Sequence, residues 1–225
     1  MDMRVVLKDP KKQDYFYEEA VKTLRTNIQF SGKQVKTVLF TSCYPNEGKS
    51  DITFSLSAEM GKMGKRVLLV DADIRKSSYA RRYYVHKTVN GLSQYLSGQA
   101  DLEEIIYHTN YENVDMIFSG PIAPNPSELL GSQDFTRLLE DKRKEYDYIF
   151  VDTPPSLNLI DAAVVARVCD AGILVIESEA VSYKVAQKVK SQIERSGCHI
   201  LGAVLNKVDV KKDKYYRSYK GYYKK

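Results

Sequence analysis

The decisive stretch of this sequence is Thr37-Val-Leu-Phe-Thr-Ser-Cys-Tyr-Pro-Asn-Glu-Gly-Lys-Ser50. Its first six residues are mostly β-branched or aromatic around the apolar run Val38-Leu-Phe40, which predicts a buried strand over 37–42. Pro45 and Asn46 predict a turn, and a helix is expected from about Lys49 to Met63, ended by Gly64. A strand, a tight turn and a helix in this order, with Gly-Lys-Ser at the start of the helix, predict an α/β fold that binds phosphate.

The turn matches most of the phosphate-binding P-loop pattern G-x-x-x-x-G-K-[ST], with Cys43 in place of the first glycine. In this pattern the backbone approaches phosphate closely at Gly48, Lys49 reaches the β- and γ-phosphates, and Ser50 offers a hydroxyl to Mg²⁺. Backbone N–H groups and the helix N-terminus add positive field. We therefore predict that the nucleotide is bound by the loop residues Asn46, Glu47, Gly48, Lys49, Ser50 and Asp51.

Three aspartates follow apolar strands elsewhere in the chain. Asp152 ends Tyr148-Ile-Phe-Val-Asp152, the Walker-B arrangement that holds Mg²⁺. Asp71 ends Val67-Leu-Leu-Val-Asp71, and Asp73 follows two residues later. In extended geometry side chains alternate with period two, so Asp71 and Asp73 are expected to point the same way. Together with the P-loop, these carboxylates predict a nucleotide site that includes a metal ion.

Apolar strands alternate with helical segments along the whole chain. This alternation predicts a mostly parallel sheet with helices on both faces, of the P-loop NTPase type, with ligands at the carboxyl ends of the strands. We expect a single domain over 1–207, with a helix at about 14–30, followed by a flexible basic tail over 208–225. Further strands are expected at 66–71, 114–118, 146–152, 171–176 and 199–205, and further helices at 92–107, 127–144, 159–168 and 182–196.

The composition favours a soluble folded protein of a reducing compartment. The 225 residues are 43% hydrophobic, enough for a core, yet no run approaches the roughly 20 apolar residues of a membrane span. The N-terminus lacks the apolar core of a signal peptide. Three cysteines, far apart and without a C-x-x-C pair, argue against disulfides and against a zinc site. The expected location is the cytoplasm.

The positive charge is concentrated at the C-terminal end. Of the formal net charge of +5, residues 207–225 contribute eight Lys or Arg and two Asp, a net of +6, which leaves −1 for residues 1–206. A nearly neutral folded part argues against nucleic-acid binding. The tail has no apolar periodicity and carries five of the 17 tyrosines, namely Tyr215, Tyr216, Tyr219, Tyr222 and Tyr223. Such tyrosines suggest a role other than packing.

These motifs together resemble the bacterial tyrosine kinases (BY-kinases) of the CpsD/CapB type, which serve capsular and exopolysaccharide biosynthesis. The resemblance rests on the P-loop at 44–50, Val-Asp-Ala-Asp-Ile-Arg-Lys at 70–76, Val-Asp-Thr-Pro-Pro at 151–155 and the tyrosine-rich tail. The segments 91–98 and 124–130 are also similar to the family. The resemblance thus covers nearly the whole chain.

The resemblance implies ATP-dependent phosphorylation of tyrosines, chiefly those of the tail as phosphoacceptors. It implies that Lys49 holds the β- and γ-phosphates and that Ser50 and Asp152, with Asp73, place Mg²⁺. Asp71 would be the candidate base near the attacking tyrosine hydroxyl. The candidate catalytic residues are therefore Lys49, Asp71, Asp73 and Asp152, and Asn206 is expected to flank the adenine.

The resemblance also implies partners. Glu19-x-x-Lys22-x-x-Arg25 is similar to the family's E-x-x-R-x-x-R oligomerisation helix, with Lys in place of the first Arg, so a ring-like homo-oligomer is expected. A chain without its own membrane span would need a membrane-anchored activator, a polysaccharide co-polymerase, and would be peripheral at the inner face of the membrane. Tyrosine-containing protein substrates and a tyrosine phosphatase are expected as well.

Three other functions stay open. An ATPase of the ParA/MinD type shares the sheet and motifs, but its signature lysine is replaced by Tyr44. A GTPase would explain Asn206-Lys-Val-Asp209 as an N-K-x-D motif, yet Asp152 is followed by Thr-Pro-Pro rather than x-x-Gly. An ATP-gated scaffold without catalysis is the third alternative. Asp51 keeps it open, because a carboxylate there would repel an α-phosphate unless it points away or pairs with a cation.

Overall fold

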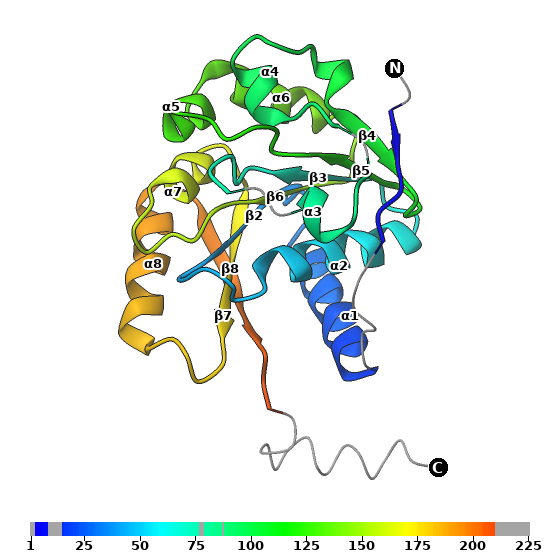
Figure 1. The fold of residues 1–225 in the computed structure, drawn as a ribbon. Helices are drawn as coiled ribbons and strands as arrows, with labels where there is room; N and C mark the ends of the chain where they lie inside the picture. Colours follow the sequence, from blue (N-terminus) through cyan, green and yellow to red (C-terminus); the bar gives the residue numbers. More distant parts are fainter. Residues whose placement is uncertain (1–2, 9–14, 77–78, 87, 210–225) are drawn as a thin grey trace.

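In the computed structural model, which describes residues 3–8, 15–76, 79–86 and 88–209, eight strands form one sheet (Figure 1). Their order is β1-β4-β5-β3-β6-β2-β7-β8, and every neighbouring pair is parallel except β4 and β5. The strands are β1 (Arg4–Val5), β2 (Thr37–Ser42), β3 (Val67–Asp71), β4 (Ile106–Thr109), β5 (Val114–Ile117), β6 (Tyr148–Asp152), β7 (Ala171–Glu177) and β8 (His199–Asn206). The predicted mostly parallel α/β sheet is confirmed.

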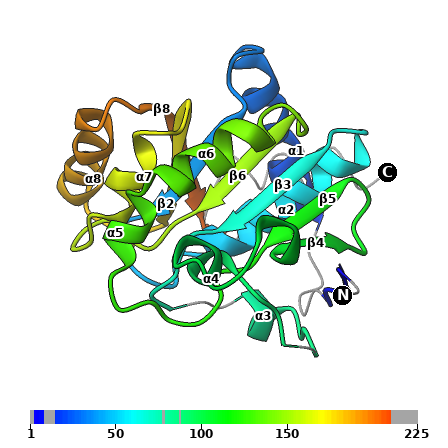
Figure 2. The same ribbon diagram turned by 90° about the horizontal axis from the view of Figure 1, so that it is seen from above.

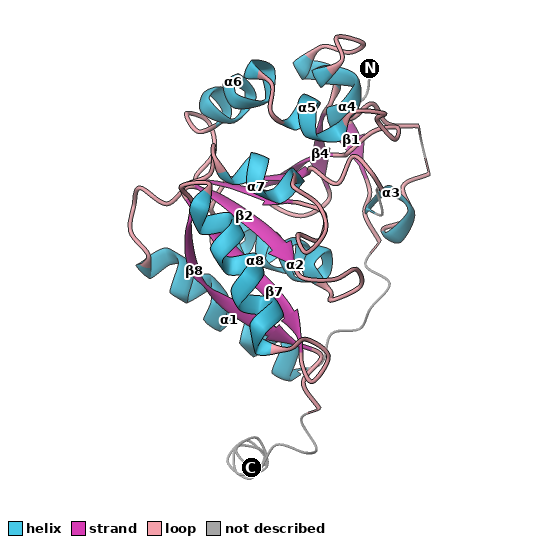
Figure 3. Cartoon of the chain, turned by 90° about the vertical axis from the view of Figure 1, so that its left-hand side faces the viewer, coloured by secondary structure: helices cyan, strands magenta, loops and turns pink. Residues whose placement is uncertain are grey.

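Helices cover both faces of the sheet. In Figure 1, α1 and α2 lie on one side and α7 and α8 on the other, and Figure 3 shows α7 and α8 from their own side. The helices are α1 (Tyr15–Phe30), α2 (Lys49–Lys62), α3 (Tyr79–Arg82), α4 (Leu92–Leu96), α5 (Pro126–Leu130), α6 (Gln133–Lys142), α7 (Asp161–Ala166) and α8 (Tyr183–Arg195), with a 3₁₀ turn at Leu102–Glu104. The helix expected at about 14–30 therefore begins at Tyr15.

Strand β3 shows why the sheet is buried on both faces. Its side chains alternate, so that Val67 and Leu69 join the core cluster that includes Phe54 and Met60 of α2. Leu68 and Val70 join the opposite cluster, which includes residues of α6, α7 and α8. Each of the four side chains is fully buried. Burying a side chain of this size contributes about 2 kcal/mol, so a continuous apolar run is stable here only as a central strand.

Two expected helices are wrong in detail. The segment predicted as a helix over 92–107 contains only α4 and the 3₁₀ turn, and then enters β4, which pairs antiparallel with β5. The segment predicted over 127–144 is two helices, because the main chain turns at Gly131 and Ser132 caps α6 through Phe135 N at 3.3 Å. The short elements β1 and α3 were not predicted. β1 has two residues and depends on its pairing with β4.

The strands that carry the candidate site are neighbours in space. Figure 2 shows β6, β3 and β5 side by side, and β2 pairs with β6 on the side away from β3. Parallel strands place their carboxyl ends at the same edge, and Asp71 is the register partner of Asp152. The loop after β2 opens at this edge too, so the topology brings the P-loop and the strand-end carboxylates together.

Within the described residues, no helix has both the length and the apolar character needed to cross a membrane. The phosphoacceptor tyrosines predicted at 215–223 lie outside the described residues, as does the predicted tail from residue 210 onward.

Candidate functional site

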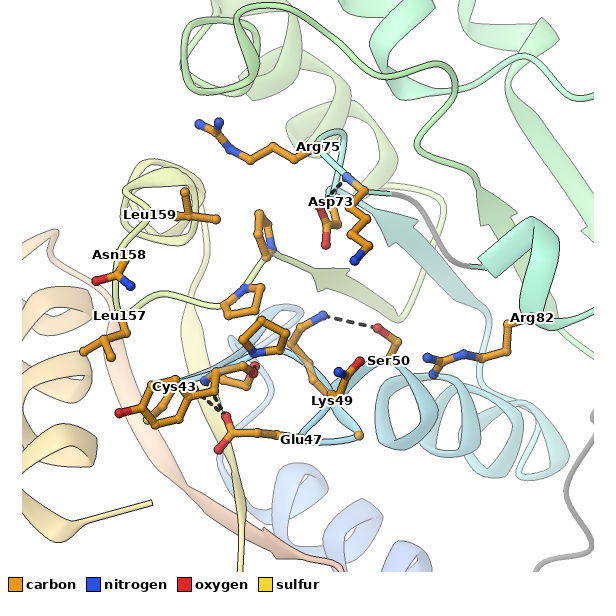
Figure 4. Close-up of a pocket in the computed structure, with 18 of the residues that line it drawn as sticks. Cys43, Glu47, Lys49, Ser50, Asp73, Arg75, Arg82, Leu157, Asn158 and Leu159 are labelled. Carbon is orange, nitrogen blue, oxygen red and sulfur yellow. Dashed lines mark hydrogen bonds between the residues drawn. The ribbon is translucent and has the colours of Figure 1, made fainter. Parts of the chain in front are cut away.

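A pocket of about 480 Å³ opens at the P-loop (Figure 4). Gly48 adopts a φ of +85°, in the left-handed region that favours glycine, and directly precedes α2. The N-terminus of this 14-residue helix therefore points its backbone N–H groups into the pocket. The pocket lining includes Asn46, Gly48, Lys49, Ser50, Asp73, Arg75, Lys76, Arg82, Pro154, Pro155 and Asn158. The loop and its surroundings are thus built to receive an anion.

Lys49 and Asp152 form the central ion pair of the site. The Lys49 ammonium lies 2.5 Å from Asp152 Oδ1 and 3.3 Å from Ser50 Oγ. The exposed fractions of the two charged side chains are 7% and 1%, so the pair is almost fully desolvated. The second carboxylate oxygen of Asp152 is buried and has no hydrogen-bond partner among the described residues. A buried carboxylate oxygen without a partner is costly, and a cation or a water ligand of one would satisfy it.

Asp71 and Asp73 lie in different environments. Strand β3 ends at Asp71, and the Asp73 carboxylate accepts a hydrogen bond from Lys76 N (3.0 Å) in the turn that follows. Asp73 N donates to Asp71 Oδ1 at 3.2 Å. Burial, together with Asp152 and Asp73, raises the pKa of Asp71 to about 8, and burial also raises the pKa of Asp73. Asp73 lines the pocket, whereas Asp71 lies behind it, 1% exposed.

Figure 4 shows how the labelled side chains divide around the loop. Lys49, Ser50 and Asp73 are turned toward one another, while Glu47 is turned toward Cys43, away from them. The Glu47 carboxylate is buried and accepts hydrogen bonds from the backbone N–H groups of Cys43 (2.6 Å) and Tyr44 (2.9 Å). The Glu47 carboxylate therefore fixes the loop internally, although Glu47 is itself one of the residues that line the pocket.

Asn206 lies behind the loop. Its amide Nδ2 donates to the Glu47 carbonyl oxygen at 2.8 Å. A Cβ atom at Gly48 would lie 2.1 Å from the same Nδ2, so a glycine is required there for space as well as for backbone conformation. The side chain expected to flank the adenine thus supports the P-loop backbone.

The Asp51 carboxylate is paired with a cation. It lies 2.5 Å from a guanidinium nitrogen of Arg82, on the short helix α3, and both side chains are mostly buried. This contact meets one of the two conditions under which a carboxylate next to Ser50 is compatible with phosphate. Arg82 was not predicted from the sequence, because it is 31 positions from Asp51 and no spacing rule links the two.

Two further polar contacts around the site were not predicted. The hydroxyl of buried Tyr79 donates to the carbonyl of Ser50 at 3.0 Å, and burial with the charge of Asp152 raises its pKa well above the usual range. Arg75 forms a two-point contact with fully buried Asp161, at 2.6 and 3.0 Å. Figure 4 shows Arg75 turned away from Lys49. These contacts hold α3 and α7 against the strand ends.

The three residues of the expected oligomerisation motif lie on α1, away from the pocket. Lys22 and Glu19 form a partly exposed ion pair at 2.7 Å. Arg25 lies 3.7 Å from Glu59 of α2, and this pair is mostly buried. Arg25 therefore contributes to packing α1 on α2 within one chain, while Glu19 and Lys22 are accessible.

The Gly48→Ala variant should bind nucleotide at least about tenfold more weakly. Its free energy of unfolding should be lower than that of the wild type by about 2 kcal/mol or more. The reason is the contact with Asn206 added to the strained φ. Urea unfolding and titration with Mg²⁺ and ADP measure both effects. Gly64→Ala is the matched control, because Gly64 has a φ of +73° and a Cβ added there would have no atom within 4 Å. Equal nucleotide affinity for both alanine variants would contradict the prediction.

The site suits a nucleotide with Mg²⁺. Among the described residues no group of three His, Cys, Asp or Glu side chains could hold a metal ion by itself. Mg²⁺ is commonly bound by one or two carboxylates with substrate phosphates, which fits Asp152, with its unpartnered oxygen, beside Ser50 and Asp73. The loop and the carboxylates would therefore hold the ion together with a phosphate.

Comparison with known proteins agrees with this geometry. A family described as "AAA domain" matches residues 46–200. The tyrosine-protein kinase CpsD of Streptococcus pneumoniae is 40% identical over 210 residues, covering 92% of each chain. The kinase domain of the Escherichia coli tyrosine kinase ETK has a TM-score of 0.81 at 34% identity and covers 85% of this chain and 76% of that one.

A more distant neighbour is the septum site-determining protein MinD of Pyrococcus horikoshii, solved with Mg-ADP. Its TM-score is 0.68 at 27% identity, over 78% of this chain and 72% of that one. Both the identity and the coverage are higher for the tyrosine kinases than for this ATPase. The chain belongs to the bacterial tyrosine-protein kinases of the CpsD type.

Proposed function

We propose that this tyrosine-protein kinase transfers phosphate from ATP to its own C-terminal tyrosines, at the site between the P-loop and the ends of β3 and β6. The observation that supports this proposal most is the buried Lys49–Asp152 pair with an unpartnered carboxylate oxygen beside Ser50. The acceptors would be Tyr215, Tyr216, Tyr219, Tyr222 and Tyr223. By family, the process served is capsule or exopolysaccharide synthesis.

The proposed reaction assigns one task to each side chain. A tyrosine hydroxyl oxygen attacks the γ-phosphorus, the bond from that phosphorus to the β,γ-bridging oxygen breaks, and ADP leaves. Lys49 and the N-terminus of α2 stabilise negative charge on the phosphates. The hydroxyl proton passes to a carboxylate. Asp71 is the candidate base by resemblance to the family. Because its pKa is raised to about 8, only the fraction of Asp71 that is ionised at neutral pH could accept the tyrosine proton.

Mg²⁺, when bound, would neutralise charge on the phosphate oxygens, with Ser50, Asp73 and Asp152 as the protein groups that place it. Such a reaction depends mainly on positioning and on charge stabilisation. Asp73 lines the pocket and is therefore better placed than Asp71 to meet the ion. The two aspartates would then have separate roles, one toward the metal and one toward the proton.

We propose that transfer can occur between subunits, because the chain after Lys207 is long. The 18 residues after Lys207 can span at most roughly 60 Å when extended. The proposed ring-like homo-oligomer would use the α1 motif, in which Glu19 and Lys22 are accessible while Arg25 pairs with Glu59 of the same chain. A membrane-anchored activator, other tyrosine-containing proteins and a tyrosine phosphatase belong to the same proposal, as does a peripheral location at the membrane.

The alternatives explain fewer observations. An ATP-gated scaffold was kept open by Asp51, and the ion pair with Arg82 removes much of the repulsion toward phosphate. The sequence Asn206-Lys-Val-Asp209 is the argument for a GTPase, yet the Asn206 side chain donates a hydrogen bond to the P-loop backbone at Glu47. A ParA/MinD-type ATPase does not account for the tyrosine cluster.

Replacing the five C-terminal tyrosines by phenylalanine should remove most of the phosphate that the protein incorporates from Mg²⁺ and ATP. Intact-mass and peptide spectrometry measure this, with the activator's cytoplasmic segment added if the chain alone is inactive. The variant should retain ATP binding, because the substitutions leave the loop unchanged. Tyr183→Phe is the matched control, since Tyr183 is 75% exposed on α8, outside the C-terminal segment. Undiminished phosphate in the five-residue variant would refute the acceptor assignment.

A further inference from the structure

Lys207 contacts the phosphate loop from the end of β8. Its ammonium lies 2.7 Å from the carbonyl oxygen of Asn46 and 2.8 Å from a carboxylate oxygen of Glu177 at the end of β7. The two elements it joins are otherwise far apart in the chain, since Asn46 is 161 positions away. The Lys207 side chain therefore connects the P-loop, at Asn46, to the end of β7, at Glu177.

The contacts of Lys207 continue into the loop. The backbone N–H of Glu177 donates to the Glu47 carboxylate at 3.3 Å, and that carboxylate accepts from the N–H groups of Cys43 and Tyr44. Asn206, the residue before Lys207, holds the Glu47 carbonyl. The loop is thus fixed on its inner side by Glu47 and Asn206, and on its outer side by Lys207.

Asn46 is the part of the loop that most needs this support. Its φ is +67°, in the left-handed region, which asparagine adopts more readily than most residues other than glycine but which is still less populated than the right-handed region. The contact with Lys207 is made to the carbonyl of this residue, so the ammonium helps to hold the left-handed turn of the loop in place. Lys207 itself has a φ of +57°, which aims its side chain from the end of β8.

We propose that Lys207 is a positioning residue for the phosphate loop, holding Asn46 and Glu47 in the conformation that binds nucleotide phosphates. This inference rests on the proposed nucleotide site. It also explains the first two residues of the N-K-x-D sequence at 206–209 by their contacts with the P-loop, without binding of a guanine base.

The test compares Lys207→Met with Lys207→Arg. Methionine keeps most of the side-chain length and removes the charge, whereas arginine keeps the charge and the donors. For Lys207→Met we expect Mg²⁺–ADP to bind about three- to tenfold more weakly, since a charged but partly exposed hydrogen bond is lost. The KM for ATP should rise by the same factor with kcat little changed, and Lys207→Arg should restore both. Hydrogen exchange in the peptide covering 43–50 should be faster in Lys207→Met.

Lys190→Met is the matched control. Lys190 forms a similar contact with Glu194 at 2.7 Å on the exposed face of α8, remote from the loop, so its loss should change neither affinity nor exchange. Lys49→Ala separates the two proposals. If Lys49→Ala loses nucleotide binding while Lys207→Met keeps full affinity and unchanged exchange, the positioning role is wrong. If Lys49→Ala binds normally, the nucleotide site is wrong and the role of Lys207 falls with it.

Discussion

Lys49→Met is expected to reduce tyrosine phosphorylation by at least about a hundredfold and to destabilise the folded protein by about 3 kcal/mol. The loss of activity follows from the loss of the ammonium that would meet the phosphates. The loss of stability has a separate cause. Asp152 is 1% exposed, and without Lys49 one of its oxygens loses its partner while the other already lacks one among the described residues. A buried charge without its counter-ion is strongly destabilising.

The double variant Lys49→Met/Asp152→Asn separates the two causes. Removing the carboxylate charge together with the ammonium should restore much of the stability, because buried ion pairs can often be replaced by neutral groups at little cost. It should not restore phosphorylation, since both the ammonium and a proposed metal ligand are gone. Urea unfolding of the wild type, both single variants and the double variant measures the coupling. Additive effects on stability would show that the pair does not stabilise the fold as described.

The strands of the central sheet could be predicted because their pattern is local. The run Val67-Leu-Leu-Val-Asp71 is apolar up to its last residue, which is typical of a short strand buried on both faces, and the structure buries it in that way. The antiparallel strand β4 was mistaken for the end of a helix. Its four residues are fixed by their pairing with β5 and by the turn at Asn113, which has a φ of +58°. Such pairing is not visible in a local pattern.

In the candidate site, too, the residues that belong to local motifs could be predicted, and the contacts between distant positions could not. Lys49, Ser50 and the strand-end carboxylates follow from motifs, and the structure brings them together. The counter-ion of Asp51 and the contact of Lys207 with the loop could not be predicted, because they join positions 31 and 161 residues apart. Glu47 was expected to bind the nucleotide, yet its side chain turns inward to the loop's own N–H groups. Sequence spacing gives the residue types of a loop, but not the direction of each side chain.

The stability of the nucleotide-free protein should fall as the pH rises from about 4 to 8, because of Asp71. Burial raises the pKa of this carboxyl to about 8 in the folded state, while in the unfolded chain it ionises near its ordinary value. Between these two values the unfolded state releases a proton that the folded state keeps, so increasing pH favours unfolding. The effect can reach about 1.4 kcal/mol for each pH unit within this interval.

Asp71→Asn should remove this dependence. The amide is close in size to the protonated carboxyl and does not ionise. Between about pH 5 and pH 8 the free energy of unfolding of the variant should therefore rise relative to that of the wild type, by about 2 kcal/mol or more. Urea unfolding at several pH values measures the difference, with Asp134→Asn as the control, because Asp134 is 58% exposed on α6. Parallel stability curves for wild type and Asp71→Asn would mean that Asp71 is ionised in the folded protein at neutral pH. In that case Asp71 would already be in the form that can accept the tyrosine proton, with a lower affinity for that proton than its burial indicates.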